Sequence, residues 1–414
     1  GEEKDINIPS IEQIQELLLD NEAMIMYGDS EWDSLYVFVV TKNQFKPFTI
    51  SSDILTSNLF SEDKLSLTDA IKYYHTYLSN PVWKEKFHNF SIAFYNHLIL
   101  PLYDTIYDKD QLIIITDGNL GLLHFETFIN EKGKYMAEMY TIKYIQSARI
   151  WGFLKRKQSS DKEESLLAIG GAIYNPKTYS EEVIENEKML TYLKRTVLDS
   201  ISTRGSLSDS YATLGYFDLQ NLPGSMQEIM DISEIIPNSD MISGKDASEY
   251  KIKEMSLNGR LSEYKIIHFA THGIVVTDIP ELSAIVLSQF EDESNGEDGY
   301  LRMGEIVELD IKADFVNLSA CETGLGKIYK GEGVVGLTQA FMIAGANSVS
   351  VTLWPVADES TSIFMREFYK TAEAMDMSYL ESMTIVKRKF IYGDFGDEYR
   401  KPYYWAPFVY YGEK

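Results

Sequence analysis

One cysteine and one histidine, each placed after an apolar run, carry the chemistry that this sequence offers. Cys321 is the only cysteine in the 414 residues, and it follows the apolar run 315–320, which is typical of a buried strand. The stretch 266–273 has the same pattern and ends at His272 and Gly273. A thiol at the end of a buried strand is either an inert core sulfur or a nucleophile.

His272 and Cys321 occupy matched positions after their predicted strands, which favours the interpretation of Cys321 as a nucleophile. In an open sheet of parallel strands, functional groups gather beyond the carboxyl ends of the strands. If the two strands are parallel neighbours, both side chains lie at one edge, and the separation of 321 − 272 = 49 residues leaves room for a crossover. A free thiol has a pKa of roughly 8.5, so it needs a base at neutral pH. We therefore expect His272 to take the thiol proton, Cys321 to attack a carbonyl, and the backbone amides of Gly273 and Cys321 to hold the oxyanion.

Each of the two residues also has a simpler interpretation. Taken alone, Cys321 would be a small core hydrophobe, and His272 would be a hydrogen-bonded loop histidine. His268 lies four residues before His272, but in a strand that spacing spans about 13 Å. We therefore expect no zinc site, and a place in the core for His268.

A glycine pattern after Cys321 is a weak match to a dinucleotide site. Gly331, Gly333 and Gly336 spell G-x-G-x-x-G, but they begin about ten residues after the nearest strand rather than directly behind it. We interpret this stretch as a loop that leads into a helix, and we expect neither a cofactor nor a bound metal.

The elements that must position these residues alternate between strand and helix. The second half has short apolar runs that predict strands, at 166–170, 240–243, 265–270, 315–320, 348–353 and 405–411. Helices are predicted between them, one capped by Ser225 with Glu228 and others at 247–257, 334–344 and 359–374. Crossovers of this length predict an α/β fold with a mostly parallel sheet covered by helices on both faces.

The first half predicts a similar but less regular arrangement. Ser10 and Gln13 fit a capping box at the start of a helix. Three strand-like runs at 23–27, 35–41 and 45–50 predict an antiparallel meander. Two predicted helices follow at 67–79 and 84–99, and then a buried strand at 111–116. The charged run 155–164 is interpreted as a linker, which predicts an N-terminal α/β subdomain at 1–158 and a catalytic domain at 159–414.

Composition narrows the classes of partner. The net charge of −25 argues against direct contact with nucleic acid and with an anionic membrane surface. A single cysteine excludes an intramolecular disulfide and fits a reducing, cytoplasmic compartment. The sequence shows neither a run of about 18 apolar residues nor a signal peptide. Gly1 stands where a start methionine would be expected, so we expect that residues upstream are missing.

Long motifs around both residues resemble the CHAT domain, a family of caspase-like and separase-like cysteine peptidases in the same clan as caspases. The motifs are H-F-A-T-H-G at 268–273, L-S-A-C-E-T-G-L-G at 318–326, G-E-G-V-V-G-L-T-Q-A-F at 331–341 and A-G-A-N-S-V-S-V-T-L-W-P-V at 344–356. Shorter matches are at 112–118, 122–128, 222–229 and 403–409. The resemblance implies His272 as base, Cys321 as nucleophile and a caspase-like fold preceded by a degenerate caspase-like subdomain. The separation of 49 residues also agrees with the spacing of roughly 50, histidine first, in caspase-type enzymes.

The resemblance further implies a cysteine endopeptidase that cleaves a protein or peptide substrate. We expect it to be latent until a partner activates it, either an activating protein or a helical-repeat regulator, and to belong to bacterial defence. The stretch 319–324 differs from the caspase pattern Q-A-C-x-G, so a preference for aspartate is not carried over. Glu332, Asp358 and Trp354 are the candidate pocket residues, with a basic P1 residue as the hypothesis. The long segment 173–215 is a candidate autoprocessing site.

Two alternatives stay open. The chain could be a non-proteolytic CHAT interaction or scaffold module in which the dyad is intact but unused. It could also be a redox sensor through Cys321, which ranks last because the chain has no resolving cysteine.

Overall fold

The structure is a computed structural model. It describes residues 9–29, 34–55, 64–80, 82, 84–157, 166–174, 211, 219–276, 279–289, 297–319, 332–354, 356, 358–375 and 377–413.

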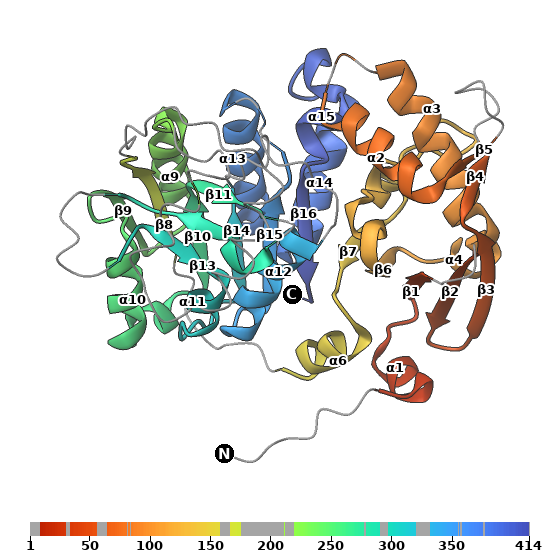
Figure 1. Cartoon of the computed structure of the whole chain (residues 1–414), viewed down its shortest axis with the longest axis horizontal. Helices are drawn as coiled ribbons and strands as arrows, with labels where there is room; N and C mark the ends of the chain where they lie inside the picture. The colour runs from red at the N-terminus through yellow and green to blue at the C-terminus, as the bar shows by residue number, and fades with distance from the viewer. Residues whose placement is uncertain are drawn as a thin grey trace, which may run out of the picture.

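An 11-stranded sheet runs through both halves of the chain (Figure 1). Its strands, in spatial order, are β3 (Phe45–Ser51), β2 (Ser34–Thr41), β1 (Glu22–Asp29), β6 (Gln111–Thr116), β7 (Thr141–Tyr144), β16 (Phe408–Gly412), β15 (Ser348–Thr352), β14 (Phe315–Leu318), β10 (Ile266–Ala270), β8 (Leu166–Ala172) and β9 (Ser239–Gly244). β1 to β3 form the predicted antiparallel meander. The last strand of the chain, β16, pairs in parallel with β7 and antiparallel with β15, and so connects the two halves.

Most neighbouring strands run parallel. The parallel pairs are β1–β6, β6–β7, β7–β16, β14–β15, β10–β14, β8–β10 and β8–β9. Parallel strands must be joined by crossovers, which here contain helices and place them against the sheet. The inner strands β10, β14 and β15 of the second half are accordingly buried along their whole length, whereas the edge strand β9 is partly exposed.

Helices cover both faces of the sheet. The helices of the second half are α9 (Pro223–Ile235), α10 (Glu249–Leu257), α11 (Met303–Val307), α12 (Glu332–Ile343), α13 (Asp358–Met375), α14 (Tyr379–Tyr392) and α15 (Pro402–Trp405). In β10, His268 contacts α9 and α13, whereas the next residue, Phe269, packs its ring against Phe341 of α12 on the opposite face. Figure 1 shows α9, α13 and α14 on one side of the strands and α10 and α12 on the other. The predicted α/β class, with a mostly parallel sheet covered on both faces, is confirmed.

Among the described residues, the first half contributes six further α-helices. They are α1 (Ile11–Leu17), α2 (Leu67–Leu78), α3 (Lys84–Phe94), α4 (Tyr103–Ile106), α5 (Met136–Met139) and α6 (Ala148–Arg156). The capping box at Ser10 and Gln13 is confirmed. Two smaller sheets complete the fold, one of β11 (His272–Ile274), β12 (Ala284–Val286) and β13 (Tyr300–Arg302), and one of β4 (Asp53–Leu55) and β5 (Lys64–Ser66).

Three details differ from the sequence predictions. The charged run expected to start a linker at residue 155 begins inside α6, which ends at Arg156. Ser225 does not cap α9, because its hydroxyl accepts a hydrogen bond from Gly171 N and donates one to Leu222 O. The helix α14 was not predicted, although Ser378 and Glu381 form a capping box at its start. The predicted autoprocessing segment 173–215 lies almost entirely outside the described residues.

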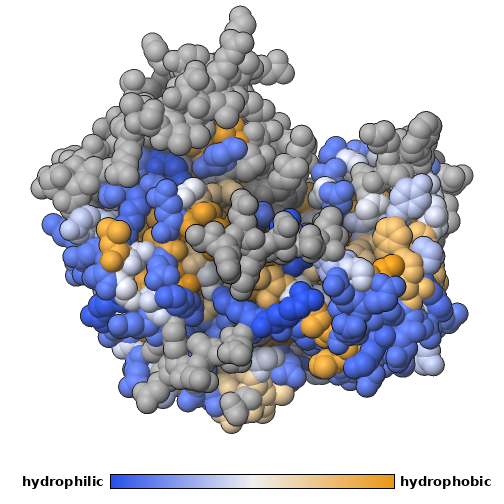
Figure 2. All heavy atoms as spheres, turned by 90° about the horizontal axis from the view of Figure 1, so that it is seen from below, coloured by the Kyte–Doolittle hydropathy of each residue, from blue (hydrophilic) through white to orange (hydrophobic). Residues whose placement is uncertain are grey.

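On the face seen from below in Figure 2, the described side chains are mostly hydrophilic, with apolar side chains grouped in smaller areas between them. Among the helices that the structure describes, we find none with the length and apolar character needed to cross a bilayer.

Candidate active site

The strands that lead to His272 and Cys321 are parallel neighbours in the sheet, as the dyad requires. β10 pairs with β14 in a register that places Phe269 opposite Leu318. Paired residues in these strands are therefore 318 − 269 = 49 positions apart, which equals the separation of His272 and Cys321. Each of the two residues thus lies three positions beyond the last paired residue of its strand, since 272 − 269 = 3 and 321 − 318 = 3. Cys321 itself lies outside the described residues.

His272 is held rigidly at the point where the chain leaves the main sheet. It opens β11, and only 1% of its surface is exposed. Its Nε2 lies 2.7 Å from the carbonyl oxygen of Gln220, which can only accept a hydrogen bond. Nε2 therefore carries the proton, and in the neutral ring the lone pair is on Nδ1. The nitrogen that can act as a base is thereby determined by a main-chain carbonyl.

Tyr174 fixes the other side of His272. Its ring packs against the imidazole with centroids 4.6 Å apart, and its hydroxyl accepts a hydrogen bond from the His272 backbone N–H at 3.2 Å. The same hydroxyl donates to the carbonyl of Val286 at 3.4 Å, in the strand that pairs with β11. Tyr174 and Gln220 were not identified from the sequence, because neither lies in a pattern that points to His272.

A buried polar group lies directly below the two strand ends. His268 Nε2 donates to Glu228 Oε1 at 2.9 Å, and the Ser319 hydroxyl donates to the same carboxylate oxygen. Asn317, opposite His268 in the register, donates from Nδ2 to His268 Nδ1 at 3.0 Å. Tyr369 of α13 lies 3.0 Å from the same Nδ1, and burial raises the pKa of its hydroxyl well above the usual value.

This group confirms the predicted core position of His268, which is fully buried. Sequence reasoning missed the role of Glu228, which it interpreted as part of a helix cap. A signal was present, because His268, Asn317 and Ser319 are polar residues within apolar strand segments, and such residues need partners when buried.

The structure places the other predicted residues only in part. Gly273 is buried in β11 and pairs with Ile285. Glu332 begins α12 and Asp358 begins α13, but both side chains lie outside the described part of the chain. Trp354 follows β15 and is buried, with Nε1 donating to the Tyr403 carbonyl at 3.0 Å.

Trp354 closes an aromatic cluster that joins the two halves. Its indole meets His124 edge-on at 5.1 Å and His75 of α2 edge-on at 6.1 Å. Burial lowers the pKa of His75 to about 4 and that of His124 well below its usual value. Both rings are therefore neutral at pH 7, and the cluster is an uncharged part of the interior.

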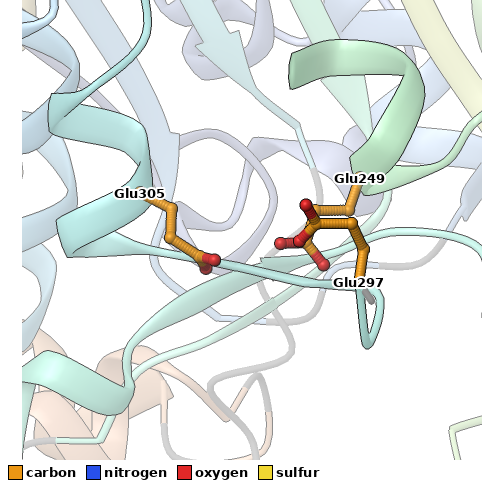
Figure 3. Close-up of side chains that lie close together, drawn as sticks. All are labelled: Glu249, Glu297 and Glu305. Atoms are coloured by element: carbon orange, nitrogen blue, oxygen red, sulfur yellow. The ribbon is translucent and has the colours of Figure 1, made fainter. Parts of the chain in front are cut away.

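One group of carboxylates has the composition of a metal site, but a lysine fills it. Glu249 of α10, Glu297 and Glu305 of α11 offer oxygen atoms within 4.8 Å of one another, and their side chains point toward a shared centre in Figure 3. Lys253 Nζ lies 2.6, 2.6 and 2.8 Å from these three residues. Since an ammonium already satisfies the three carboxylates, their arrangement is explained without a cation from solution.

Comparisons with known proteins agree with the motifs around these strand ends. The human Tetratricopeptide repeat protein 28 is 22% identical over 299 residues, covering 67% of this chain and 11% of that protein. Its mouse counterpart is 25% identical over 179 residues, covering 36% of this chain and 7% of that protein. The chain therefore corresponds to about a tenth of the length of these relatives.

Solved structures of the Saccharomyces cerevisiae separase–securin complex, at 2.6 and 3.0 Å resolution, also match. Each has a TM-score of 0.45 and 10% identity, over 97% of this chain and 30% of the matched chain. The model of the CHAT domain matches residues 90–413, a range that contains β10, β14 and both candidate residues. Because that match covers well over half of the sequence, this chain belongs to the CHAT domain family.

Proposed function

We propose that this protein is a cysteine endopeptidase in which His272 and Cys321 form the catalytic dyad. The observation that carries the proposal is the shared register of β10 and β14, in which paired residues differ by the same 49 positions as His272 and Cys321. The fixed Nε2–H tautomer of His272 supports it, because a thiol needs a base with a defined lone pair. Membership of a family of cysteine peptidases agrees with this chemistry.

The proposed reaction has two halves. The Cys321 thiol gives its proton to His272 Nδ1, and the thiolate attacks the carbonyl carbon of the scissile amide. The tetrahedral intermediate collapses, the C–N bond breaks, and the imidazolium gives its proton to the leaving amine. A water molecule then gives a proton to His272 and attacks the thioester. The C–S bond breaks, which releases the acid, and the departing sulfur takes the proton back from the imidazolium, which restores the thiol. The amides of Gly273 and Cys321 are the proposed donors to the oxyanion.

The burial of His272 supports a defined role in this sequence. A ring that is 1% exposed, with one nitrogen bonded to Gln220 and one face against Tyr174, loses little rotational freedom when it reacts. Its main-chain partner also stabilises the charge that the ring gains, because a carbonyl oxygen interacts favourably with an imidazolium N–H.

The proposed partners are a protein or peptide substrate and a regulator. Glu332, Asp358 and Trp354 stay candidate residues of the substrate pocket, with a basic P1 residue as the hypothesis. The matched relatives are named as tetratricopeptide repeat proteins, which supports a helical-repeat regulator that activates a latent enzyme. A cytoplasmic location, a place in bacterial defence, and 1–158 and 159–414 as separate domains belong to the same proposal.

The first test measures the reactivity of Cys321, which is the only thiol in the chain. Rates of alkylation by iodoacetamide between pH 5.5 and 9 are compared for the wild type and His272→Ala, with Cys321→Ala as the blank. We expect the wild type to react at least about tenfold faster at pH 7, because the neighbouring base raises the thiolate fraction. Equal rates and an ordinary thiol profile in both proteins would remove the dyad.

The second test asks for cleavage. The same three proteins are incubated with a mixed peptide library, and the products are identified by mass spectrometry. Cuts that vanish in both His272→Ala and Cys321→Ala establish an endopeptidase and give its P1 residue. A reactive thiol without cuts indicates a latent enzyme, and an unreactive thiol without cuts favours the interaction module.

A further inference from the structure

The carboxylate of Glu228 joins the two strands of the proposed dyad at a single atom. Its Oε1 accepts hydrogen bonds from Ser319, directly after β14, and from His268, in β10. Ser319 is two residues before Cys321 in the chain, and His268 is four residues before His272. No other described contact ties both strand ends to the helix layer through one acceptor.

The hydrogen bonds among Glu228, His268, Asn317 and Ser319 agree with one arrangement of the protons, with the Tyr369 hydroxyl 3.0 Å from the same His268 Nδ1. Asn317 Nδ2 can only donate, so His268 Nδ1 must accept its hydrogen bond. In the neutral ring Nε2 then carries the proton and donates to Glu228 Oε1 at 2.9 Å. The Ser319 hydroxyl donates to the same oxygen. Glu228 is thus the acceptor at the end of a chain of donors, and its position determines theirs.

Burial makes these contacts costly to lose. His268 is fully buried, Asn317 and Ser319 are 1% and 4% exposed, and Glu228 is 7% exposed. A buried donor without its partner is strongly unfavourable, so the side chains stay in this arrangement rather than exchanging partners with water. A backbone hydrogen bond also holds the ends of β10 and β14 together, because Ser319 N donates to Phe269 O at 2.9 Å, one residue beyond the strand pairing.

We propose that Glu228 is a positioning residue of the active site, which holds Ser319 and His268 on one oxygen and so fixes the spacing between the strand ends that lead to Cys321 and His272. This proposal rests on the proposed dyad and adds to it a support that comes from α9. The contacts recorded for Glu228 Oε1 are with Ser319 and His268, so we assign its effect on the thiol to the backbone that these two residues anchor, which is an effect of geometry rather than of proton transfer.

The test again uses alkylation of Cys321 as a function of pH, because this readout needs no substrate. Ser319→Ala removes one donor and little volume, and Ser348→Ala is its matched control. Ser348 is a fully buried serine at the opposite end of the neighbouring strand β15, where its hydroxyl donates to the Asp314 carbonyl at 2.7 Å. Both variants lose one buried hydrogen bond, so a purely structural effect should be similar in the two.

We expect Ser319→Ala to react with iodoacetamide about tenfold more slowly at pH 7, with a pH profile shifted toward that of an ordinary thiol. Ser348→Ala should stay within about twofold of the wild type, at a similar urea midpoint for the two variants. Glu228→Gln keeps an acceptor oxygen in place and should stay close to the wild type, whereas Glu228→Ala should resemble Ser319→Ala. Comparing Glu228→Gln with Glu228→Ala thus shows whether the position of the acceptor oxygen or the charge of the carboxylate matters.

The outcomes separate this proposal from the proposed function. A wild type that reacts no faster than His272→Ala removes the dyad, and the role of Glu228 falls with it. A reactive wild type with an unchanged Ser319→Ala leaves the dyad standing and overturns the positioning role. Equal loss in Glu228→Gln and Glu228→Ala would also overturn it, because the carboxylate charge and not its position would then matter.

Discussion

His272 takes its orientation from two residues that lie far from it in the sequence. Gln220 holds its Nε2–H and Tyr174 holds its backbone and one face of its ring. Because the imidazole is buried, these contacts replace the water that would otherwise let it turn. The orientation of this imidazole is therefore a property of the fold around β11 rather than of the histidine itself.

Tyr174→Phe tests this dependence. The variant keeps the ring but loses the hydroxyl that accepts from His272 N–H and donates to Val286, so we expect a loss of about 1 kcal/mol in unfolding free energy. Tyr27→Phe is the control, since its buried hydroxyl donates to the Leu98 carbonyl at 3.0 Å in the other half of the chain. Urea unfolding should show similar losses in both, but only Tyr174→Phe should slow the alkylation of Cys321. Equal alkylation rates would show that Tyr174 has no part in orienting His272.

The sequence predicted His272 but not its neighbours, for a physical reason. A glycine after a buried strand marks the histidine locally. Tyr174, Gln220 and Glu228 reach the site only through the pairing of β8, β10 and β14 and the packing of α9, which depend on contacts between distant segments. The predicted role of Cys321, outside the described residues, stays a prediction.

The lysine at the centre of three carboxylates links α10 to α11. Burial and the neighbouring Glu305 carboxylate raise the pKa of Glu249 to about 9, although Lys253 opposes this effect. Such a group binds a proton in the folded state at pH values where the unfolded chain has lost it. Its contribution to stability is therefore largest at acidic pH, and it declines as the pH rises from about 4.5 toward 9.

Lys253→Met should destabilise the protein by about 3 kcal/mol at pH 7, because it leaves Glu297 and Glu305 without their shared cation, while Glu249 already holds a proton at this pH. Part of the loss should return at pH 5, because the Glu305 carboxyl group, whose pKa Lys253 helps to lower, then takes up a proton more easily. Lys251→Met is the matched control on the same helix, since both side chains of its ion pair with Glu254 are about 40% exposed and the pair should contribute little. Urea unfolding at both pH values measures these differences. A Lys253→Met variant as stable as Lys251→Met would contradict the argument.

The two histidines beside Trp354 should make the stability of the protein depend on pH with a sign opposite to that of Glu249. Burial lowers the pKa of His75 from 6.5 to about 4, so between these two pH values the unfolded chain binds a proton at His75 that the folded chain does not bind. Stability therefore falls as the pH decreases from 6.5 toward 4. His124 has the same direction and cause.

When the pH decreases from 7 to 5, the lowered pKa of His75 should reduce the free energy of unfolding by at most about 2 kcal/mol. His75→Gln should remove that part of the pH dependence, whereas His88→Gln should not, because His88 is exposed on α3. Unfolding curves of the two variants and the wild type at several pH values provide the measurement. Identical slopes in all three proteins would mean that His75 is not protected from protonation.

Single elements were predicted well where their pattern is local, and less well where distant charges decide. The strand pattern of 315–320 and the helix pattern of 334–344 correspond to β14 and α12. By contrast, α14 mixes apolar and charged residues, and its Lys387 is buried against Glu126 of the first half at 3.0 Å. Its buried face cannot be recognised without that partner.

The two halves of the chain share one sheet, and a buried ion network crosses their junction. Glu413, directly after β16, lies 2.8 Å from Lys143 of β7 and 2.7 Å from Lys155 of α6. Glu22 of β1 lies 3.5 and 3.4 Å from the same lysines. Burial acts to lower the pKa of Lys155, but the two carboxylates outweigh it and raise the pKa. The charged run 155–164, which was predicted to be a linker, is thus fixed at its first residue, because Lys155 pairs with carboxylates of β1 and of the residue after β16.

This junction determines whether 1–158 and 159–414 unfold separately. Glu413→Gln leaves an unpaired positive charge in a network where Lys143 and Glu22 are each 2% exposed, so we expect a loss of about 3 kcal/mol. Glu254→Gln, at the partly exposed pair with Lys251, should cost much less. Hydrogen exchange in increasing urea, read by mass spectrometry, follows peptides from both halves. Since β16 lies between β15 and β7, we expect both halves of the variant to lose protection together at a lower urea concentration. Loss confined to residues 159–414 would instead show that 1–158 is a domain that folds without its neighbour.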